Sequence, residues 1–315
     1  MASGSNTPSP GSAELGLAGK VSIVTGSGRG LGLAYAQALA AAGAAVVVND
    51  VDAAAADAAV ELIAAEGGRA VSCTVPAGPS ASAATLIDRA VEHFGRLDIF
   101  VANAGILRDT VLWKMSDDDF DTVIDVHLRG TFTGVRAAAI KMRQQGDGGR
   151  IICIGSPTGQ LGNFGQTNYA AAKAGIVGMV RTWSLELARS NITVNAVVPV
   201  AATEMTRTIP ALRQYVDALD RGEELPAFAR RELGFGGPVD VAGLVAFLAS
   251  DAAAGITGQA IGIGGDRLAL WSHPSEVAVG FQDGGWDAKA IAAAWPSMFA
   301  PAHQPVGPNL PEAPK

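Results

Sequence analysis

Cysteine is scarce in this chain of 315 residues, which contains only Cys73 and Cys153. Each lies in an apolar run of the kind that forms a buried strand. Two cysteines placed in this way do not build the disulfide framework of a small secreted domain. We therefore expect two buried free thiols and a reduced, cytoplasmic compartment.

An excess of positive charge is also missing. The 23 lysines and arginines face 30 aspartates and glutamates, which gives a net charge of −7 at pH 7. This balance argues against nucleic acid or an anionic membrane as a general partner. A Gly-x-Ser-x-Gly turn for acyl transfer is absent. The histidines are scattered without the spacing of metal ligands, so no metal is expected; they are His93, His127, His273 and His303.

Long apolar runs are few. The longest, residues 31–48, approaches the length of a membrane span, but it is mostly alanine and contains Gln37 and Gly43. A helix followed by a buried strand explains this run better. Residues 1–12 are rich in Ser, Gly and Pro and lack the basic start and apolar block of a signal peptide. We expect a disordered leader over residues 1–18.

The chain does contain a regular alternation of short apolar runs and helical segments over residues 19–265. Because the apolar runs are continuous rather than alternating, both faces of each strand should be buried, as in a parallel sheet. The pattern predicts one α/β domain with a doubly wound parallel sheet of the Rossmann type and helices on both faces. Strands are expected at Val21–Thr25, Ala45–Val48, Ala70–Val75, Leu97–Ala102, Arg150–Ile154, Ile192–Val198 and Gln259–Ile263, and helices at Leu31–Ala42, Ala53–Glu66, Ala81–Phe94, Asp117–Gln144, Thr167–Arg189 and Val239–Ser250.

Two segments depart from the alternation. Residues 200–237 are mixed in character and follow a strand end, which is the place of a substrate lid. Arginines in this lid either contact phosphates of a substrate or form a solvated face. Residues 266–315 form a C-terminal extension with apolar residues at 268–271 and a possible helix at 287–295. This extension covers the substrate pocket, packs on a neighbouring subunit, or only shields apolar surface of its own domain; the sequence leaves these three alternatives open.

A glycine-rich turn at residues 25–32 lies between the first expected strand and the first expected helix. Glycines permit a tight turn and a close approach of the backbone to a pyrophosphate, and the helix N-terminus offers free N–H groups to it. This context predicts a dinucleotide site. Cofactor contacts are expected from Gly26, Arg29, Gly30, Leu31 and Gly32.

Asp50 ends the second strand, about 20 residues after the glycines. An acid there accepts hydrogen bonds from the adenosine ribose and repels a 2′-phosphate, which favours NAD over NADP. Two alternatives stay open: Asp50 only caps the following loop, or Arg29 meets the phosphate of NADP. Residues 103–105 follow the fourth strand, where small side chains leave room for a nucleotide.

Tyr169 and Lys173 are four residues apart on an expected helix and therefore share one face. A phenol loses its proton near pH ~10, and an ammonium held nearby lowers that pKa toward the working pH. The pair is suited to acid–base chemistry on an alcohol or carbonyl. A Tyr and a Lys at this spacing also occur on solvated helix faces, so the interpretation depends on the rest of the chain.

Taken in order, these motifs resemble the short-chain dehydrogenase/reductase family. Ser156 stands thirteen residues before Tyr169, the spacing that this family uses, and the resemblance covers residues 19 to about 265. It implies a catalytic set of Ser156, Tyr169 and Lys173. It also implies cofactor contacts at Thr74, Val75, Asn103, Ala104, Gly105, Tyr169, Lys173, Pro199 and Thr203.

A narrower resemblance links residues 126–130 and 162–169 to the (R)-3-hydroxyacyl-CoA dehydrogenase part of peroxisomal multifunctional enzymes, which implies NAD. Three positions depart from the wider family. His127 replaces an Asn that supports a proton relay, and it either joins such a relay or is a hydrogen-bonded helix residue. Thr74 replaces an adenine-contacting Asp, and Val200 replaces a Gly.

The expected reaction is hydride transfer between a secondary alcohol and NAD⁺. Tyr169 takes the hydroxyl proton, Lys173 lowers the pKa of Tyr169 and Ser156 orients the reacting oxygen. Thr203 either holds the nicotinamide carboxamide or is an ordinary loop residue. The expected substrate is a 3-hydroxyacyl-CoA, with a steroid or terpenoid alcohol as the rival. A non-catalytic NAD-binding regulatory subunit is the alternative of another class. The resemblance implies a homodimer or homotetramer.

Overall fold

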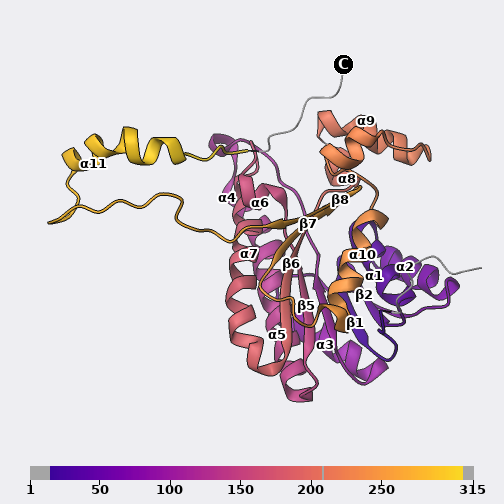
Figure 1. The fold of residues 1–315 in the computed structure, drawn as a ribbon. Helices are drawn as coiled ribbons and strands as arrows, with labels where there is room; N and C mark the ends of the chain where they lie inside the picture. Colours follow the sequence, from indigo (N-terminus) through magenta and orange to yellow (C-terminus); the bar gives the residue numbers. More distant parts are fainter. Residues whose placement is uncertain (1–14, 208, 308–315) are drawn as a thin grey trace, which may run out of the picture.

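The computed structural model describes residues 15–207 and 209–307, and the described strands form one sheet of eight. The strand order is β3-β2-β1-β4-β5-β6-β7-β8, in which β1 to β7 pair in parallel and β8 pairs antiparallel with β7 (Figure 1). The expected doubly wound fold is confirmed. The strands are β1 Val21–Thr25, β2 Ala45–Asn49, β3 Arg69–Cys73, β4 Ile99–Ala102, β5 Gly149–Ile154, β6 Ile192–Pro199, β7 Ala260–Gly264 and β8 Arg267–Trp271.

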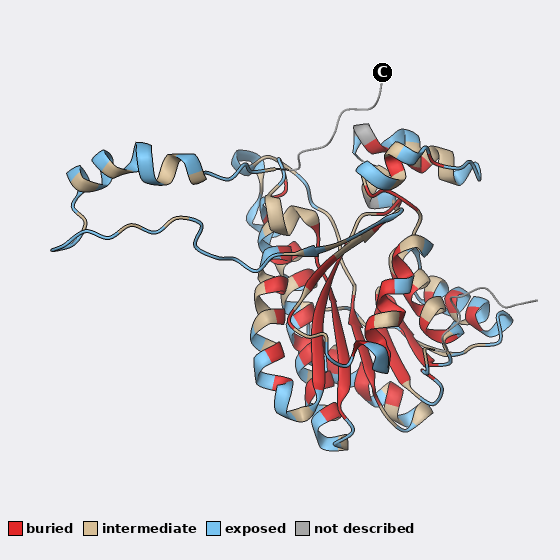
Figure 2. Ribbon diagram, viewed as in Figure 1, coloured by how far each residue is buried: buried red, intermediate tan, exposed pale blue. Residues whose placement is uncertain are grey.

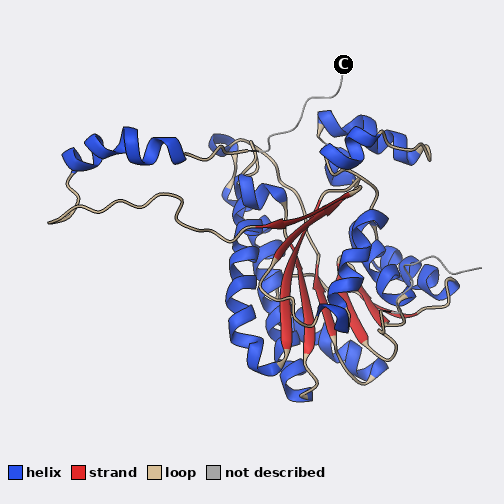
Figure 3. Cartoon of the chain, in the orientation of Figure 1, coloured by secondary structure: helices blue, strands red, loops and turns tan. Residues whose placement is uncertain are grey.

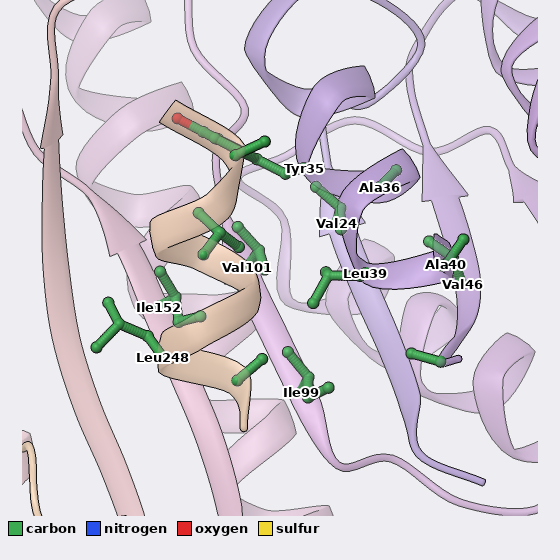
Figure 4. Packing of buried hydrophobic residues seen from close by; sticks show 14 of the residues in the cluster. Val24, Tyr35, Ala36, Leu39, Ala40, Val46, Ile99, Val101, Ile152 and Leu248 are labelled. Carbon is green, nitrogen blue, oxygen red and sulfur yellow. The ribbon is translucent and has the colours of Figure 1, made fainter. Parts of the chain in front are cut away.

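Helices cover both faces of the sheet (Figure 3). On one face, Leu39 of α1 and Leu248 of α10 pack against strand residues such as Val101 (Figure 4). On the other face, α3, α5 and α7 bury an equivalent cluster that includes Cys73 and Cys153, both free thiols as expected. The main helices are α1 Gly30–Ala41, α2 Ala53–Ala65, α3 Ser80–Phe94, α4 Asp117–Val123, α5 Gly130–Gln145, α6 Pro157–Leu161, α7 Thr167–Leu187 and α10 Val239–Ala249.

Burial explains why these segments became strands. Each residue of β1, β2, β4 and β5 is buried, so the continuous apolar runs do fill the space between two helical layers (Figure 2). The bounds expected for all seven strands agree with the observed bounds of β1 to β7 within two residues. The bounds expected for the first three helices agree equally well with those of α1, α2 and α3. The long helix expected over residues 117–144 differs: a π-helical segment, η2 Ile124–Arg129, joins α4 to α5. This wider turn carries His127.

The lid segment, residues 200–237, follows β6 and contains α8 Glu204–Arg207, α9 Pro210–Asp220 and the π-helical turn η4 Phe228–Glu232. It has a small apolar core of its own, in which Leu212 and Val216 of α9 pack with Phe235. A backbone hydrogen bond from Ala202 N to Gly236 O joins the two ends of the segment at 2.7 Å. The lid is therefore a compact unit fixed at its base.

The C-terminal extension begins with β8 and runs outward before α11 Ala288–Ala294, η6 Trp295–Phe299 and η7 Ala300–Ala302 lead back (Figure 1). None of residues 266–307 is fully buried (Figure 2). Residues 1–14 of the expected leader and the last eight residues of the extension lie outside the described residues. Leu17, by contrast, is buried in the main core, so the folded domain starts before residue 19.

Among the described residues, no helix is both long enough and apolar enough to cross a membrane.

Candidate active site

One large cleft, of about 1270 Å³, opens at the carboxyl ends of the parallel strands and under the lid segment. This is the edge at which doubly wound sheets bind ligands. The cleft brings together every residue that the sequence analysis singled out except Thr74. These residues are Gly26, Arg29, Gly30, Leu31, Gly32, Asp50, Val75, Asn103, Ala104, Gly105, His127, Ser156, Tyr169, Lys173, Pro199 and Thr203.

The glycine turn fits a dinucleotide because side chains have no room in it. A Cβ on Gly32 would collide with Gly26 O and lie 2.7 Å from Asn103 Nδ2. Gly26 has φ 62°, and a Cβ there would lie 2.8 Å from Ala104 Cα. The turn leads directly into the twelve-residue helix α1, whose first residues Gly30, Leu31 and Gly32 line the cleft. The free N–H groups of a helix N-terminus favour a pyrophosphate at such a place.

The turn and residues 103–105 brace each other. Asn103 Nδ2 donates to Thr25 O at 2.9 Å and to Gly26 O at 3.0 Å. In return, Thr25 Oγ1 accepts from Asn103 N at 2.9 Å and from Ala104 N at 3.0 Å. Residues 103–105 therefore do more than leave space in the cleft, because the side-chain amide of Asn103 also fixes the shape of the glycine turn.

Asp50 lies at the end of β2 and is 9% exposed. Its Oδ2 accepts from Gly28 N at 3.1 Å, and its Oδ1 accepts from Asp52 N at 3.1 Å. The carboxylate thus closes the following loop and also lines the cleft, so the two roles considered for it do not exclude each other. Arg29 forms an ion pair with Asp52 at 2.7 Å.

At the ends of β2 and β3, the sequence analysis missed Asn49, and its candidate Thr74 lies outside the cleft. Asn49 Nδ2 donates to Cys73 O and to Val75 O, both at 2.9 Å, and so holds the loop after β3, in which Val75 lines the cleft. Thr74 is exposed and lines a separate hollow with Thr85, and it is not among the residues that line the cleft. Val75 takes the position in the cleft.

The three proposed catalytic side chains meet at the end of β5 and on α7. Ser156 is the N-cap of α6, and its Oγ accepts from Thr158 N at 3.2 Å; the same hydroxyl acts to lower the pKa of Tyr169. Lys173 is 3% exposed. Its Nζ donates to Ile154 O at 2.7 Å and lies 5.6 Å from the centre of the Tyr169 ring.

Burial dominates the protonation of this group. It lowers the pKa of Lys173 to about 7, because an ammonium loses its hydration there. The expectation that Lys173 lowers the pKa of Tyr169 is not met in the protein by itself. Burial of the phenol raises the pKa of Tyr169 and outweighs the hydrogen bond from Ser156 that acts to lower it. A lysine that is half neutral near pH ~7 is a weak counter-charge.

His127 stands edge-on to Tyr169, with ring centres 5.2 Å apart. Its Nε2 lies 3.0 Å from Ile106 N and 2.8 Å from Ile106 O, so either tautomer finds a backbone partner. Burial lowers the pKa of His127 to about 3, which keeps the imidazole neutral, and its Nδ1 has no partner among the described residues. A Cβ on Gly105 would lie 2.9 Å from this Nδ1, which explains the glycine. The histidine is a hydrogen-bonded helix residue; a proton relay through it stays a prediction.

Around Pro199 and Thr203, the chain enters the lid segment. Thr203 N donates to Thr206 Oγ1 at 2.7 Å, and Thr206 Oγ1 in turn donates to Ala201 O at 3.0 Å. Val200 N donates to Ile263 O at 2.9 Å, which keeps the chain in the sheet at the position where the family has glycine. Thr203 reaches the cleft, and Thr206 beside it was missed by the sequence analysis.

Three further polar residues line the cleft near Tyr169, and the sequence analysis did not single them out. They are Thr158, Asn163 and Gln166. They lie in the segment just before Tyr169, so proximity to that residue was the available signal. The lid arginines, by contrast, are largely taken up by acids. Arg207 pairs with Glu204, Asp217 and Asp220, Arg221 with Glu223, and Arg230 with Asp240 and Asp266.

Residues 15–207 and 209–307 contain no cluster of potential metal ligands.

Comparison with known proteins agrees with this geometry. A family model described as "Enoyl-(Acyl carrier protein) reductase" matches residues 26–265. The chain belongs to the short-chain dehydrogenase/reductase family, and it is an oxidoreductase.

Its relatives include a 3-oxoacyl-[acyl-carrier-protein] reductase of Synechocystis sp., 42% identical over 257 residues that make up 80% of this chain and 98% of that protein. The peroxisomal multifunctional enzyme type 2 of Drosophila melanogaster is 45% identical over 61% of this chain, which spans only 33% of that protein. A solved short chain dehydrogenase from Mycobacterium avium superimposes with a TM-score of 0.78 and 34% identity, over 92% of this chain and 98% of that one.

Proposed function

We propose that this protein is an NAD-dependent dehydrogenase that interconverts a secondary alcohol and a ketone. The observation that carries the proposal is the meeting of Ser156, Tyr169 and Lys173 in the same cleft as the glycine turn and Asp50. Interconversion of an alcohol and a ketone needs a proton transfer and a hydride transfer. A proton-transfer group and a dinucleotide-binding turn in one cavity would supply both.

Asp50 supports NAD as the cofactor. Its carboxylate lies at the cleft edge where the adenosine ribose would bind, and a 2′-phosphate would meet its negative charge. Arg29, the residue that favoured NADP, is bound to Asp52 and would have to leave that ion pair to reach a phosphate. The tightly packed glycines at 26 and 32 would hold the pyrophosphate.

When bound, the nicotinamide supplies or accepts the hydride. Tyr169 exchanges the proton of the substrate hydroxyl, and Ser156 donates a hydrogen bond to the same oxygen. The positive charge of the oxidised cofactor acts in the direction that the buried phenol needs, toward the phenolate. Lys173, fixed to Ile154 O, lines the cleft, where its remaining N–H donors would bind the nicotinamide ribose.

For the substrate, we propose a 3-hydroxyacyl thioester, with the CoA ester as the first choice. The names of the relatives refer to acyl-carrier-protein reductases and to peroxisomal multifunctional enzymes. The pairing of Arg207, Arg221 and Arg230 with acids weighs against phosphate contacts from these three arginines, which would favour CoA most directly. This observation keeps a steroid or terpenoid alcohol as the second candidate.

The decisive comparison is NAD⁺ reduction with an (R)-3-hydroxyacyl-CoA, the same acyl group on acyl carrier protein, and a hydroxysteroid, each repeated with NADP⁺. Turnover of the steroid without either thioester would refute the first choice. Preference for NADP⁺ would refute the role given to Asp50. Binding of NAD without turnover of any substrate would favour the non-catalytic regulatory subunit.

Tyr169→Phe tests the catalytic assignment itself. We expect unchanged NAD binding and a turnover reduced at least about a hundredfold, the lower range of acid–base contributions. Tyr215→Phe is the matched control, because Tyr215 lies in the lid segment and packs against Phe235, with ring centres 6.1 Å apart. Near-normal turnover in Tyr169→Phe would end the assignment.

We further propose a cytoplasmic homo-oligomer, a homodimer or homotetramer, formed through the outer faces of α5 and α7. These faces expose Phe132, Ile140 and Leu185, the last with 80% of its surface exposed. Light scattering on the purified protein would show a multiple of the 31.9 kDa chain mass, and a monomer would refute this.

A further inference from the structure

A hydrogen-bonded group lies at the substrate end of the cleft and centres on Gln166, the N-cap of α7. Gln166 is 8% exposed, and its Oε1 accepts from Asn163 Nδ2 at 2.9 Å and from Thr158 Oγ1 at 3.1 Å. Its Nε2 donates to Asp109 Oδ2 at 2.8 Å. Gln166, three residues before Tyr169 at the start of α7, thus holds the carboxylate of Asp109.

The loop that carries Asp109 is fixed on both sides of that residue. Asn168, which is fully buried, donates from Nδ2 to Arg108 O at 3.0 Å. Thr110 N donates to Gly165 O at 2.9 Å. Both neighbours of Asp109 are therefore bound to the segment that leads into α7, which fixes the backbone at Asp109, and the hydrogen bond from Gln166 Nε2 holds the carboxylate itself.

Several titratable or polar groups among the described residues lie beside Tyr169 or act on its pKa. Lys173 lies one turn further along α7, His127 on η2 is neutral, and Ser156 at the end of β5 contributes a hydrogen bond without charge. Tyr35 on α1 is buried and stays protonated. Asp109 is the anionic member of this set, and Gln166, which holds it, lies about one helical turn before Tyr169. Partial burial raises the pKa of Asp109 and the hydrogen bond from Gln166 acts against that rise, while the charge of Asp109 acts to raise the pKa of Tyr169.

We propose that Asp109, held by Gln166, is a positioning residue that sets the pH range in which Tyr169 exchanges its proton with the substrate. The inference rests on the proposed function and deepens it. A fixed negative charge keeps the phenol protonated until an opposing positive charge arrives, which the oxidised cofactor provides. Tyr169 would then be an acid ready for ketone reduction and become a base with NAD⁺ bound.

Asp109→Asn removes this charge and preserves the geometry, because the new amide oxygen still accepts from Gln166. The titration of Tyr169 is then measured directly by NMR of ¹³C-labelled tyrosine, since the chain has only 3 tyrosines and Tyr169→Phe assigns the signal. We expect its midpoint to fall by about half a pH unit, as one charge acting through partly solvated surroundings produces. Asp109 is an exposed residue, which limits the effect.

Asp118→Asn is the matched control, because Asp118 is an exposed aspartate in the first turn of neighbouring α4. It should leave the Tyr169 midpoint in place. In the pH profile of alcohol oxidation, the midpoint of the rising limb should move down in Asp109→Asn, in the same direction as the NMR titration.

An unmoved Tyr169 midpoint in Asp109→Asn, or an equal shift in Asp118→Asn, would overturn the proposal. So would a loss of activity at every pH without displacement of the profile, because a purely structural role produces that result. The NMR titration needs no substrate. A shifted titration in a protein that oxidises no alcohol would therefore refute the proposed function while leaving the electrostatic coupling in place.

Discussion

Gly32→Ala offers the sharpest test of the cofactor cradle. Gly32 lies in α1, and a Cβ there would collide with Gly26 O and come within 2.7 Å of Asn103 Nδ2. Both atoms belong to the braced turn, so the turn has to move by about 1 Å to restore ordinary contact distances. A misplacement of about 1 Å at a reacting centre can cost about a hundredfold in rate, and cofactor binding at this turn depends on an equally close fit. We expect the Kd for NAD to rise by at least this factor, or about 2.7 kcal/mol.

The same substitution in an open place provides the control. Gly243 lies in α10, where a Cβ would meet no atom of another segment within 4 Å, so Gly243→Ala shares the gain in helix propensity without the collision. That gain is roughly 1 kcal/mol, and thermal unfolding should show it. In Gly32→Ala, overpacking of about 1–3 kcal/mol should cancel or exceed it.

Calorimetric titration with NAD and thermal unfolding of both variants would decide the matter. Gly32→Ala with the NAD affinity of the unmodified protein would refute the placement of the pyrophosphate at this turn. Weakened NAD binding in Gly243→Ala would show that the loss reflects general damage to the fold.

Two further predictions concern charge. Burial lowers the pKa of His127 to about 3 from about 6.5, so the unfolded chain binds more protons than the folded one between these pH values. The free energy of unfolding should therefore fall as the pH drops from ~6.5 toward ~3. In chemical denaturation, His127→Gln should flatten this slope, while His93→Gln, at an exposed histidine, should leave it unchanged. Asp50→Ser removes the negative charge that a 2′-phosphate would meet, so the ratio of kcat/KM for NADP⁺ to kcat/KM for NAD⁺ should rise at least about tenfold. Asp57→Ser, at an exposed aspartate, is the control and should leave this ratio unchanged. An unchanged ratio in Asp50→Ser would contradict the role given to Asp50.

Short-range patterns in the sequence determined the fold and the core of the site. Continuous apolar runs predicted strands buried on both faces, and β1 and β2 are buried throughout. The glycine turn, Asp50 and the spacing of Tyr169 and Lys173 needed only the periodicity of one strand or one helix to be recognised. These features are local, so the order of residues along the chain was enough.

Contacts between segments far apart in the sequence were decided only by the tertiary structure. Asn49 reaches Val75, and Gln166 reaches Asp109 across 57 positions, pairings that no local pattern marks. The direction of the Tyr169 pKa shift depends on how deeply the fold buries the phenol and how weakly the half-neutral Lys173 opposes that burial. Burial and long-range electrostatics are properties of the packed molecule, and for that reason the sequence identified the candidate catalytic groups while the fold determined their protonation.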